Sequence, residues 1–174
     1  MKIAEDKDDF RTPREFFEGV CATHGDFQLD VAANSENFLV QPYYSKGNSG
    51  LINDWMGNRI WCNPPYSDPQ AWIKKAIQEL DLENCQQVFM LLPVDTSCRW
   101  FHDYIYERAA EIWFIKGRLV FSGPNSQPKA TSPRANCLVI LTKDGYKHPT
   151  VFGQMGKNGL PFNIQSKLTQ YICD

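Results

Sequence analysis

The chain has 174 residues, 43% of them hydrophobic, and a formal net charge of −2 at pH 7. This length suits one compact domain with its own core, and no apolar run approaches membrane-spanning length. The charged first residues lack the apolar segment of a signal peptide, and the six cysteines and three histidines form no zinc motif. We therefore expect one domain over residues 1–174, cytoplasmic, with reduced thiols, no metal and no membrane partner.

The first predicted elements are a helix, a strand and a long loop. Thr12 and Pro13 precede a helical pattern of apolar residues, with Pro suited to the first turn and Thr to the cap before it. Residues 27–31 predict a strand that ends in small residues. Residues 34–50 are rich in Asn, Ser and Gly and predict an irregular loop.

The next strand leads into the most informative motif of the chain. The apolar run at residues 58–62 predicts a buried strand, and the sequence Asn-Pro-Pro-Tyr follows directly at residues 63–66. Two successive prolines fix φ and remove two backbone donors, so the motif can neither extend a sheet nor enter a helix interior. The motif therefore forms a stiff loop that presents an amide side chain, backbone carbonyls and one aromatic face.

This loop suits methylation of an exocyclic amine on a planar ring. The side-chain oxygen of Asn63 and the carbonyl of Pro64 can each accept one N–H of such an amine, leaving its lone pair directed at a methyl donor. Pro65 stiffens the loop, and the Tyr66 ring can stack on the base, which is worth roughly 1–3 kcal/mol per base elsewhere. The alternative is a rigid turn with a buried Tyr. The position at a strand end favours a ligand site.

The remaining sequence alternates between strands and helices. A helix is predicted from Asp68 and Pro69 and a second one after residues 96–97. Further strands are predicted over residues 87–92, 111–121 and 136–142, with a Pro-containing link at 122–135. Such alternation favours an α/β fold with a single, mostly parallel sheet and helices on both faces.

Several short motifs occur together in a specific order. They are Thr12-Pro13, residues 29–33 (LDVAA), 51–57 (LINDWMG), 63–67 (NPPYS), 91–93 (LLP), 100–102 (WFH) and 116–119 (KGRL). Over residues 8–142, this arrangement resembles the Dam-like DNA N6-adenine methyltransferases of phages and prophages. That family is a branch of the S-adenosylmethionine-dependent Rossmann-like methyltransferases.

The resemblance implies a Rossmann-like methyltransferase fold, compact or slightly truncated, because only 33 positions separate Asp30 from Asn63. It implies methyl transfer from S-adenosylmethionine to an adenine flipped out of double-stranded DNA, at a short GATC-like site or with relaxed specificity. The catalytic residues would then be Asn63, Pro64, Pro65 and Tyr66. The enzyme would act in the cytoplasm of a bacterial host.

Cofactor contacts are expected at the ends of the early elements. Asp30 ends the first strand, where its carboxylate can accept from the ammonium group of the cofactor; a local cap is the alternative. The resemblance places Thr12 and Pro13 at the cofactor's carboxylate side, with a plain helix cap as the alternative for Thr12. Ala32 belongs to the loop after the first strand, which has no glycine. A dinucleotide or triphosphate site is disfavoured because both use Gly-rich motifs.

The cofactor's adenine is assigned to two neighbouring residues. Asp54 resembles the acidic residue that accepts from the adenine amine, and Trp55 could cover the adenine ring. A turn-forming Asp and a core Trp are the alternatives. The group that binds the ribose stays unassigned.

Positive charge gathers in the second half of the chain. Residues 114–150 hold six Lys and Arg but one acidic residue, so a basic DNA-facing half is plausible despite the weakly negative total. The predicted DNA contacts are Lys116, Arg118, Lys129 and Arg134, and the 122–135 loop and 143–174 tail are candidate DNA-contacting appendages. Phe121 could line the base pocket opposite Tyr66 or belong to the core. A solvated rim is the alternative for the charges.

Two other functions remain open. RNA and protein-glutamine methyltransferases also use Asn-Pro-Pro-Tyr, so the acceptor need not be DNA. A non-catalytic DNA-binding module that has lost its cofactor through the glycine-free loop is the third hypothesis.

Overall fold

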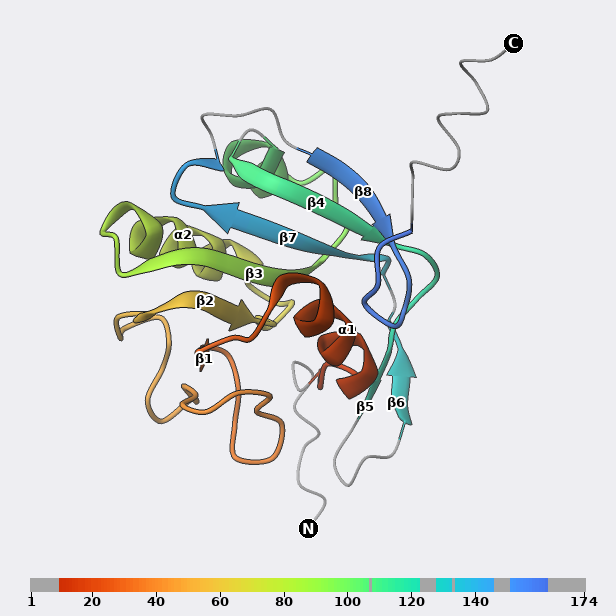
Figure 1. The fold of residues 1–174 in the computed structure, drawn as a ribbon, viewed down its shortest axis with the longest axis horizontal. Coiled ribbons are helices and arrows are strands. Elements are labelled where there is room, and N and C mark those ends of the chain that lie inside the picture. Colours follow the sequence, from red (N-terminus) through yellow and green to blue (C-terminus); the bar gives the residue numbers. More distant parts are fainter. Residues whose placement is uncertain (1–9, 107, 123–127, 133, 146–150, 163–174) are drawn as a thin grey trace.

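The computed structural model describes residues 10–106, 108–122, 128–132, 134–145 and 151–162 (Figure 1). The helical elements are α1 (Arg14–His24), α2 (Pro69–Asp81), α3 (Arg99–Phe101) and the π-helix η1 (His102–Tyr106). The strands are β1 (Leu29–Asp30), β2 (Gly57–Cys62), β3 (Cys85–Pro93), β4 (Ala109–Ile115), β5 (Val120–Ser122), β6 (Pro128–Thr131), β7 (Asn136–Thr142) and β8 (Val151–Met155).

The main sheet has six strands in the order β1-β2-β3-β7-β4-β8. Strands β1, β2 and β3 are parallel neighbours, and β8 runs parallel to β4. Strand β7 lies between β3 and β4 and is antiparallel to both. The carboxyl ends of β2, β3 and β4 therefore lie at the same end of the sheet as the first residue of β7. The predicted mostly parallel α/β sheet is confirmed.

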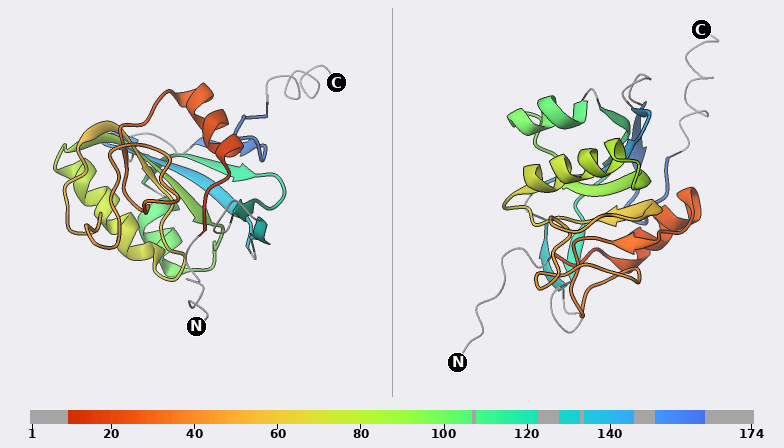
Figure 2. Two further views of the ribbon diagram at one scale, coloured as in Figure 1. Left: turned by 90° about the horizontal axis from the view of Figure 1, so that it is seen from below. Right: turned by 90° about the vertical axis from the view of Figure 1, so that its left-hand side faces the viewer.

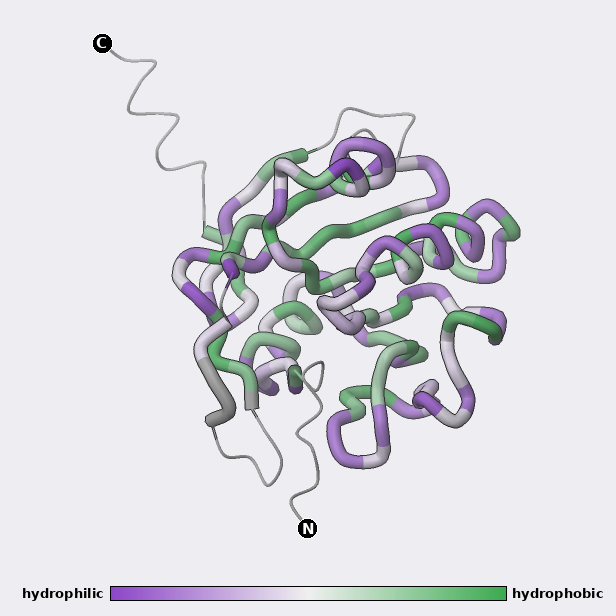
Figure 3. The backbone as a smooth tube through the Cα atoms, turned by 180° about the vertical axis from the view of Figure 1, so that it is seen from behind, coloured by the Kyte–Doolittle hydropathy of each residue, from purple (hydrophilic) through white to green (hydrophobic). Residues whose placement is uncertain are grey.

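Helices cover both faces of this sheet (Figure 2). Side chains alternate along the strands, so Ile60 and Cys62 face a core with α2 and α3, while Trp61 faces a core with α1. The same alternation continues along β3 and β7. The strands in the middle of the sheet are hydrophobic along most of their length, as expected for a sheet covered on both faces (Figure 3).

The segment between β1 and β2 is a long loop. Residues 31–56 contain no named helix or strand, yet Tyr43 pairs with Asp30 in an isolated parallel bridge. The Tyr44 amide donates to the Asp30 carbonyl at 2.8 Å, and the Asp30 amide donates to the Pro42 carbonyl at 3.2 Å. This short piece therefore extends the hydrogen bonding of the sheet beyond β1.

Three local expectations are corrected. Helix α1 begins one residue later than predicted, with Pro13 rather than Thr12 at its N-cap and no side-chain cap bond. The predicted strand over 111–121 is broken, because Gly117 adopts a positive φ of 80° and turns the chain from β4 toward β5. Strand β6 lies within the predicted 122–135 link and pairs with β5 in a separate two-stranded sheet.

The described part of the 143–174 tail adds the edge strand β8 to the main sheet. Within the described ranges, none of the helices combines the length and apolar character needed to cross a membrane.

Candidate active site

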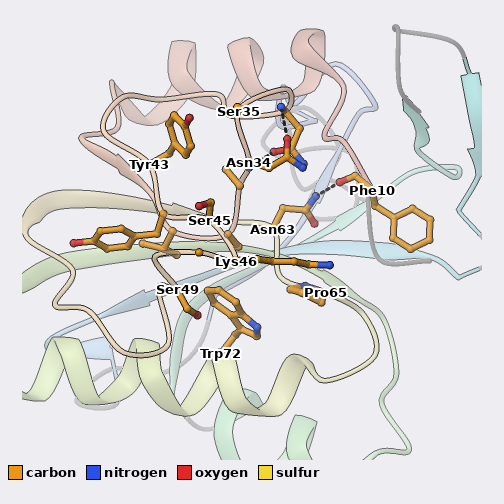
Figure 4. A pocket seen from close by; sticks show the side chains of 16 residues that line it. Phe10, Asn34, Ser35, Tyr43, Ser45, Lys46, Ser49, Asn63, Pro65 and Trp72 are labelled. Carbon is orange, nitrogen blue, oxygen red and sulfur yellow. Dashed lines mark hydrogen bonds between the residues drawn. The ribbon is translucent and has the colours of Figure 1, made fainter. Parts of the chain in front are cut away.

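The Asn-Pro-Pro-Tyr loop leaves the sheet at the carboxyl end of β2. The side-chain nitrogen of Asn63 donates to the Phe10 carbonyl at 2.6 Å (Figure 4). Its side-chain oxygen is buried and has no hydrogen-bond partner among the described residues. A buried polar atom without a partner costs roughly 1–3 kcal/mol, so such an atom is a good candidate for binding a ligand. Asn63 therefore presents a free acceptor.

Tyr66 is fixed from several sides. Its hydroxyl accepts from the side-chain amide of Asn136 at 2.8 Å. Its ring stacks on Phe10, with centroids 5.4 Å apart and planes 27° from parallel, and meets the fully buried Phe121 edge to face at 6.1 Å. Burial raises the pKa of Tyr66 above its ordinary value, and the bond from Asn136 offsets only part of this rise. The phenol therefore stays neutral at physiological pH.

A cavity of about 390 Å³ opens beside Asn63 (Figure 4). It lies between the loop after β1, the 43–49 segment, the Asn-Pro-Pro-Tyr loop and α2. Its lining residues are Phe10, Val31, Ala32, Ala33, Asn34, Ser35, Asn37, Tyr43, Tyr44, Ser45, Lys46, Gly47, Ser49, Asn63, Pro65 and Trp72. Its size and its mixture of aromatic, small and polar side chains suit a cofactor-sized ligand.

A smaller cavity of about 10 Å³ shares part of this wall. Thr12, Asp30, Ala32 and Asn63 all line it, and Phe10, Ala32, Asn37 and Asn63 line both cavities. The structure thus brings together three of the predicted cofactor residues and the first residue of the catalytic motif. Within the motif, Pro65 lines the larger cavity and Pro64 is buried.

Asp30 is a buried carboxylate at the edge of the site. It is 3% exposed, and its two oxygens accept from the Leu39 amide at 3.0 Å and the Ala32 amide at 3.4 Å. Burial raises the pKa of Asp30 to about 7, although the two amide bonds oppose this rise. Asp30 therefore holds the 32–39 loop against β1 and can change charge near neutral pH.

The predicted adenine pair lies outside the cavity lining. Trp55 is fully buried, its indole donates to the Gly50 carbonyl at 2.7 Å, and its backbone amide donates to the buried Glu79 at 2.8 Å. This is the core placement that the sequence left open, and the ring does not cover the cavity. Asp54 is exposed at the rim, where its carbonyl accepts from the Tyr44 hydroxyl at 2.8 Å.

Three of the four predicted DNA contacts follow β4 or precede β7, at the end of the main sheet where Asn63 also lies. Lys116 and Arg118 follow β4 and are exposed. Arg134 precedes β7 and pairs with Asp95 at 2.7 Å. Lys129 belongs to β6, and its side chain, like residues 123–127 and 133 of the link, lies outside the described part of the structure.

Sequence reasoning missed Phe10, Asn136 and the cavity-lining Lys46. Phe10 and Asn136 contact the motif from sequence distances of 53 and 70 residues, so no local pattern marks them. The Tyr43-Tyr44 pair did carry a signal, because two adjacent aromatic residues in a loop need a surface to pack on.

The sheet order, the helices on both faces and a cavity at the carboxyl ends of β1 and β2 define an α/β fold with a ligand-sized site where the strands end. The family model for "DNA N-6-adenine-methyltransferase (Dam)" matches residues 2–160. The chain belongs to this family.

Individual relatives agree with this assignment. The chain is 39% identical over 114 residues to the DNA N-6-adenine-methyltransferase of Escherichia phage T1, covering 65% of this chain and 47% of that protein. It is 39% identical over 89 residues to the enzyme of the same name from Haemophilus phage HP1, covering 51% and 50%. The chain thus spans about half the length of these relatives.

A solved structure described as an RNA methyltransferase, from Pyrococcus horikoshii, matches with a TM-score of 0.40 and 12% identity. The match covers 59% of this chain and 50% of the other.

The bond between Asn136 and Tyr66 predicts a coupled effect on stability. Asn136→Ala leaves the Tyr66 hydroxyl without this donor and should lower the free energy of unfolding by about 1–3 kcal/mol. Once Tyr66→Phe has removed the hydroxyl, Asn136→Ala should cost less. Urea unfolding of both single variants and the double variant measures this coupling, with Asn58→Ala on the exposed start of β2 as a control. Additive effects would contradict the interaction.

Proposed function

We propose that this chain transfers a methyl group from S-adenosylmethionine to the N6 nitrogen of an adenine in duplex DNA. The observation that carries the proposal is the buried oxygen of Asn63, which has no partner among the residues that the structure describes and lies beside a cofactor-sized cavity, in a chain of this family. The names of the phage relatives support the choice of DNA adenine as the acceptor.

The cavity residues fit the proposed cofactor. Aromatic and small residues line most of the 390 Å³ space, and Asp30 with the Asn and Ser side chains supplies acceptors for an ammonium group and hydroxyls. Thr12 and Pro13 lie at the start of α1 next to this wall, and Asp54 lies at the rim through its bond with Tyr44. When bound, S-adenosylmethionine supplies a methyl group activated by its positively charged sulfur.

The protein's own contribution is orientation. Asn63 accepts one N–H of the adenine amine through its side-chain oxygen, and the Pro64 carbonyl is proposed to accept the other. The lone pair of N6 then points away from both acceptors, toward the cavity. The bound cofactor would supply its methyl group to N6 as the carbon–sulfur bond breaks with its electrons left on sulfur, and the proton displaced from N6 would leave to solvent. Tyr66 holds the ring plane by stacking.

The target base must leave the duplex, which costs a few kcal/mol. Four basic residues are proposed to bind the DNA backbone around the extruded base: Lys116, Arg118, Lys129 and Arg134. The segments that carry them follow β4 or precede β7, toward the end of the sheet where Asn63 lies. Arg134 would have to exchange its partner Asp95 for a phosphate. We propose a short GATC-like site or relaxed adenine methylation.

The role of Asn63 is tested by separating methyl transfer from cofactor binding. Asn63→Ala should lower transfer to unmethylated duplex DNA by about 10²–10³-fold, because a positioned polar group at the reacting atom is lost. The affinity for S-adenosylmethionine, measured by calorimetry, should change little. Asn58→Ala should affect neither property. A collapse of cofactor affinity would contradict the placement of Asn63 at the acceptor amine, and transfer by the wild type to RNA or protein but not DNA would contradict the substrate.

The raised pKa of Asp30 predicts that cofactor binding depends on pH. The carboxylate form attracts the cofactor's ammonium group, and protonation removes this attraction, so affinity should fall as the pH drops below about 7. The limit is about tenfold per pH unit. Asp30→Asn should flatten the profile, and methylthioadenosine, which lacks the ammonium group, should bind independently of this pH range. An equal slope in wild type and Asp30→Asn would contradict the assignment.

The proposed DNA contacts predict a change in salt dependence. Lys116→Ala and Arg118→Ala should each weaken binding to duplexes of different sequence by a similar factor and reduce the slope of log affinity against log salt by about one. Lys143 provides the matched control, because it follows β7 at the opposite end of the sheet, near the start of β3. Fluorescence anisotropy over a range of salt concentrations measures the slopes. Equal changes in the Lys143→Ala control would contradict this binding face.

A further inference from the structure

Phe10 contacts both residues that are proposed to hold the adenine. Its carbonyl accepts from the side-chain nitrogen of Asn63 at 2.6 Å, and its ring stacks on Tyr66 at 5.4 Å. The same ring packs against Phe121, with centroids 5.2 Å apart. Phe10 also lines the two cavities that meet at Asn63. It is separated from the Asn-Pro-Pro-Tyr motif by more than fifty residues of sequence.

The carbonyl contact decides which end of the Asn63 amide faces the substrate. A carboxamide has an oxygen that accepts and a nitrogen that donates, and the two ends are almost equal in size. The proposed reaction needs the oxygen, because the adenine amine must donate to it. A backbone carbonyl accepts hydrogen bonds but cannot donate them, so the Phe10 carbonyl selects the nitrogen of Asn63 as its partner. The oxygen is left buried and without a partner among the described residues.

The ring contact fixes the other recognition element. Tyr66 is supported by the Phe10 ring and by the edge contact with Phe121, and Asn136 holds its hydroxyl. A platform that is already fixed loses less conformational freedom when a base stacks on it. The close-up view shows the Phe10 ring turned away from the other side chains that line the cavity, while its carbonyl faces Asn63 (Figure 4). Phe10 thus lies on the side of the acceptor base.

We infer that Phe10 is a positioning residue for the methyl acceptor, orienting the Asn63 amide through its carbonyl and the Tyr66 ring through its own ring. This inference rests on the proposed function. Phe10 lies four positions before the first residue of α1, so the same short segment that brings Thr12 to the cavity wall also sets the geometry of the acceptor site.

The first test replaces the ring while keeping the backbone carbonyl. Phe10→Leu preserves apolar bulk and should lower kcat for DNA methylation by about three- to tenfold, as expected for the loss of an aromatic pair. The affinity for S-adenosylmethionine should change less than twofold. Phe10→Tyr keeps the ring and should restore most of kcat. Phe152→Leu is the matched control, since Phe152 stacks on Phe114 at 6.4 Å on the β8 edge.

Opposite results would overturn the inference. If Phe10→Leu increased kcat or tightened DNA binding, the ring would be competing with the base for Tyr66 rather than supporting it. If Phe10→Leu and Phe152→Leu lowered kcat equally, in proportion to their loss of stability, the role of Phe10 would be structural.

A second measurement needs no substrate and separates this inference from the proposed function. The side-chain NH₂ signal of Asn63 can be assigned by nuclear magnetic resonance through its disappearance in Asn63→Ala. In the wild type, one of its protons should be protected from solvent exchange by the Phe10 carbonyl, and Phe10→Leu, which keeps that carbonyl, should leave the protection in place. Free exchange of both protons in the wild type would refute the orientation of Asn63, whether or not DNA is the acceptor.

Discussion

The termination of β2 by two prolines is the constraint on which the site depends. Pro64 and Pro65 cannot donate to a neighbouring strand, so the chain must leave the sheet directly after Asn63. The side chains of the loop then find partners far away in the sequence, at Phe10 and at Asn136. These two contacts satisfy the Asn63 nitrogen and the Tyr66 hydroxyl but leave the Asn63 oxygen without a partner in the described part of the chain. A rigid loop with one unsatisfied acceptor is the physical basis of the proposed chemistry.

The antiparallel direction of β7 supplies the second half of the site. Because β7 runs against its neighbours, its first residue, Asn136, lies opposite Pro93 at the end of β3. The segment that precedes β7 therefore lies at the end of the sheet where β2 and β4 stop. Arg134 lies at this end, as do Lys116 and Arg118. A strand parallel to β3 and β4 at this position would place its first residue at the opposite end of the sheet. One reversal of direction thus brings the support for Tyr66 and the positive charges to the same side.

Local patterns predicted those elements whose stability is local. The start of α2 is an example, since Asp68 caps the helix by accepting from the Ala71 amide and Pro69 occupies the first turn. The Asn-Pro-Pro-Tyr loop was predicted for a similar reason, because proline limits the backbone wherever it occurs. The break between β4 and β5 was missed because a single residue, Gly117, turns an otherwise continuous apolar run.

Long-range contacts explain the remaining differences. Nothing adjacent to Trp55 reveals that its amide binds Glu79, which lies 24 positions away and fixes the indole in the core. Thr12 was assigned to the cofactor, with a helix cap as the alternative; Pro13 takes the N-cap position, and Thr12 lines the small cavity together with Asp30 and Asn63. The site was therefore predictable where one short motif carries the chemistry, and not where distant residues hold that motif in place.

The most direct test of the account is the chemical identity of the methylated product. Unmethylated duplex DNA is incubated with the protein and isotopically labelled S-adenosylmethionine, and its nucleosides are separated by mass spectrometry. The account predicts labelled N6-methyldeoxyadenosine. Label on cytosine, or transfer to RNA or protein with none to DNA, would contradict it.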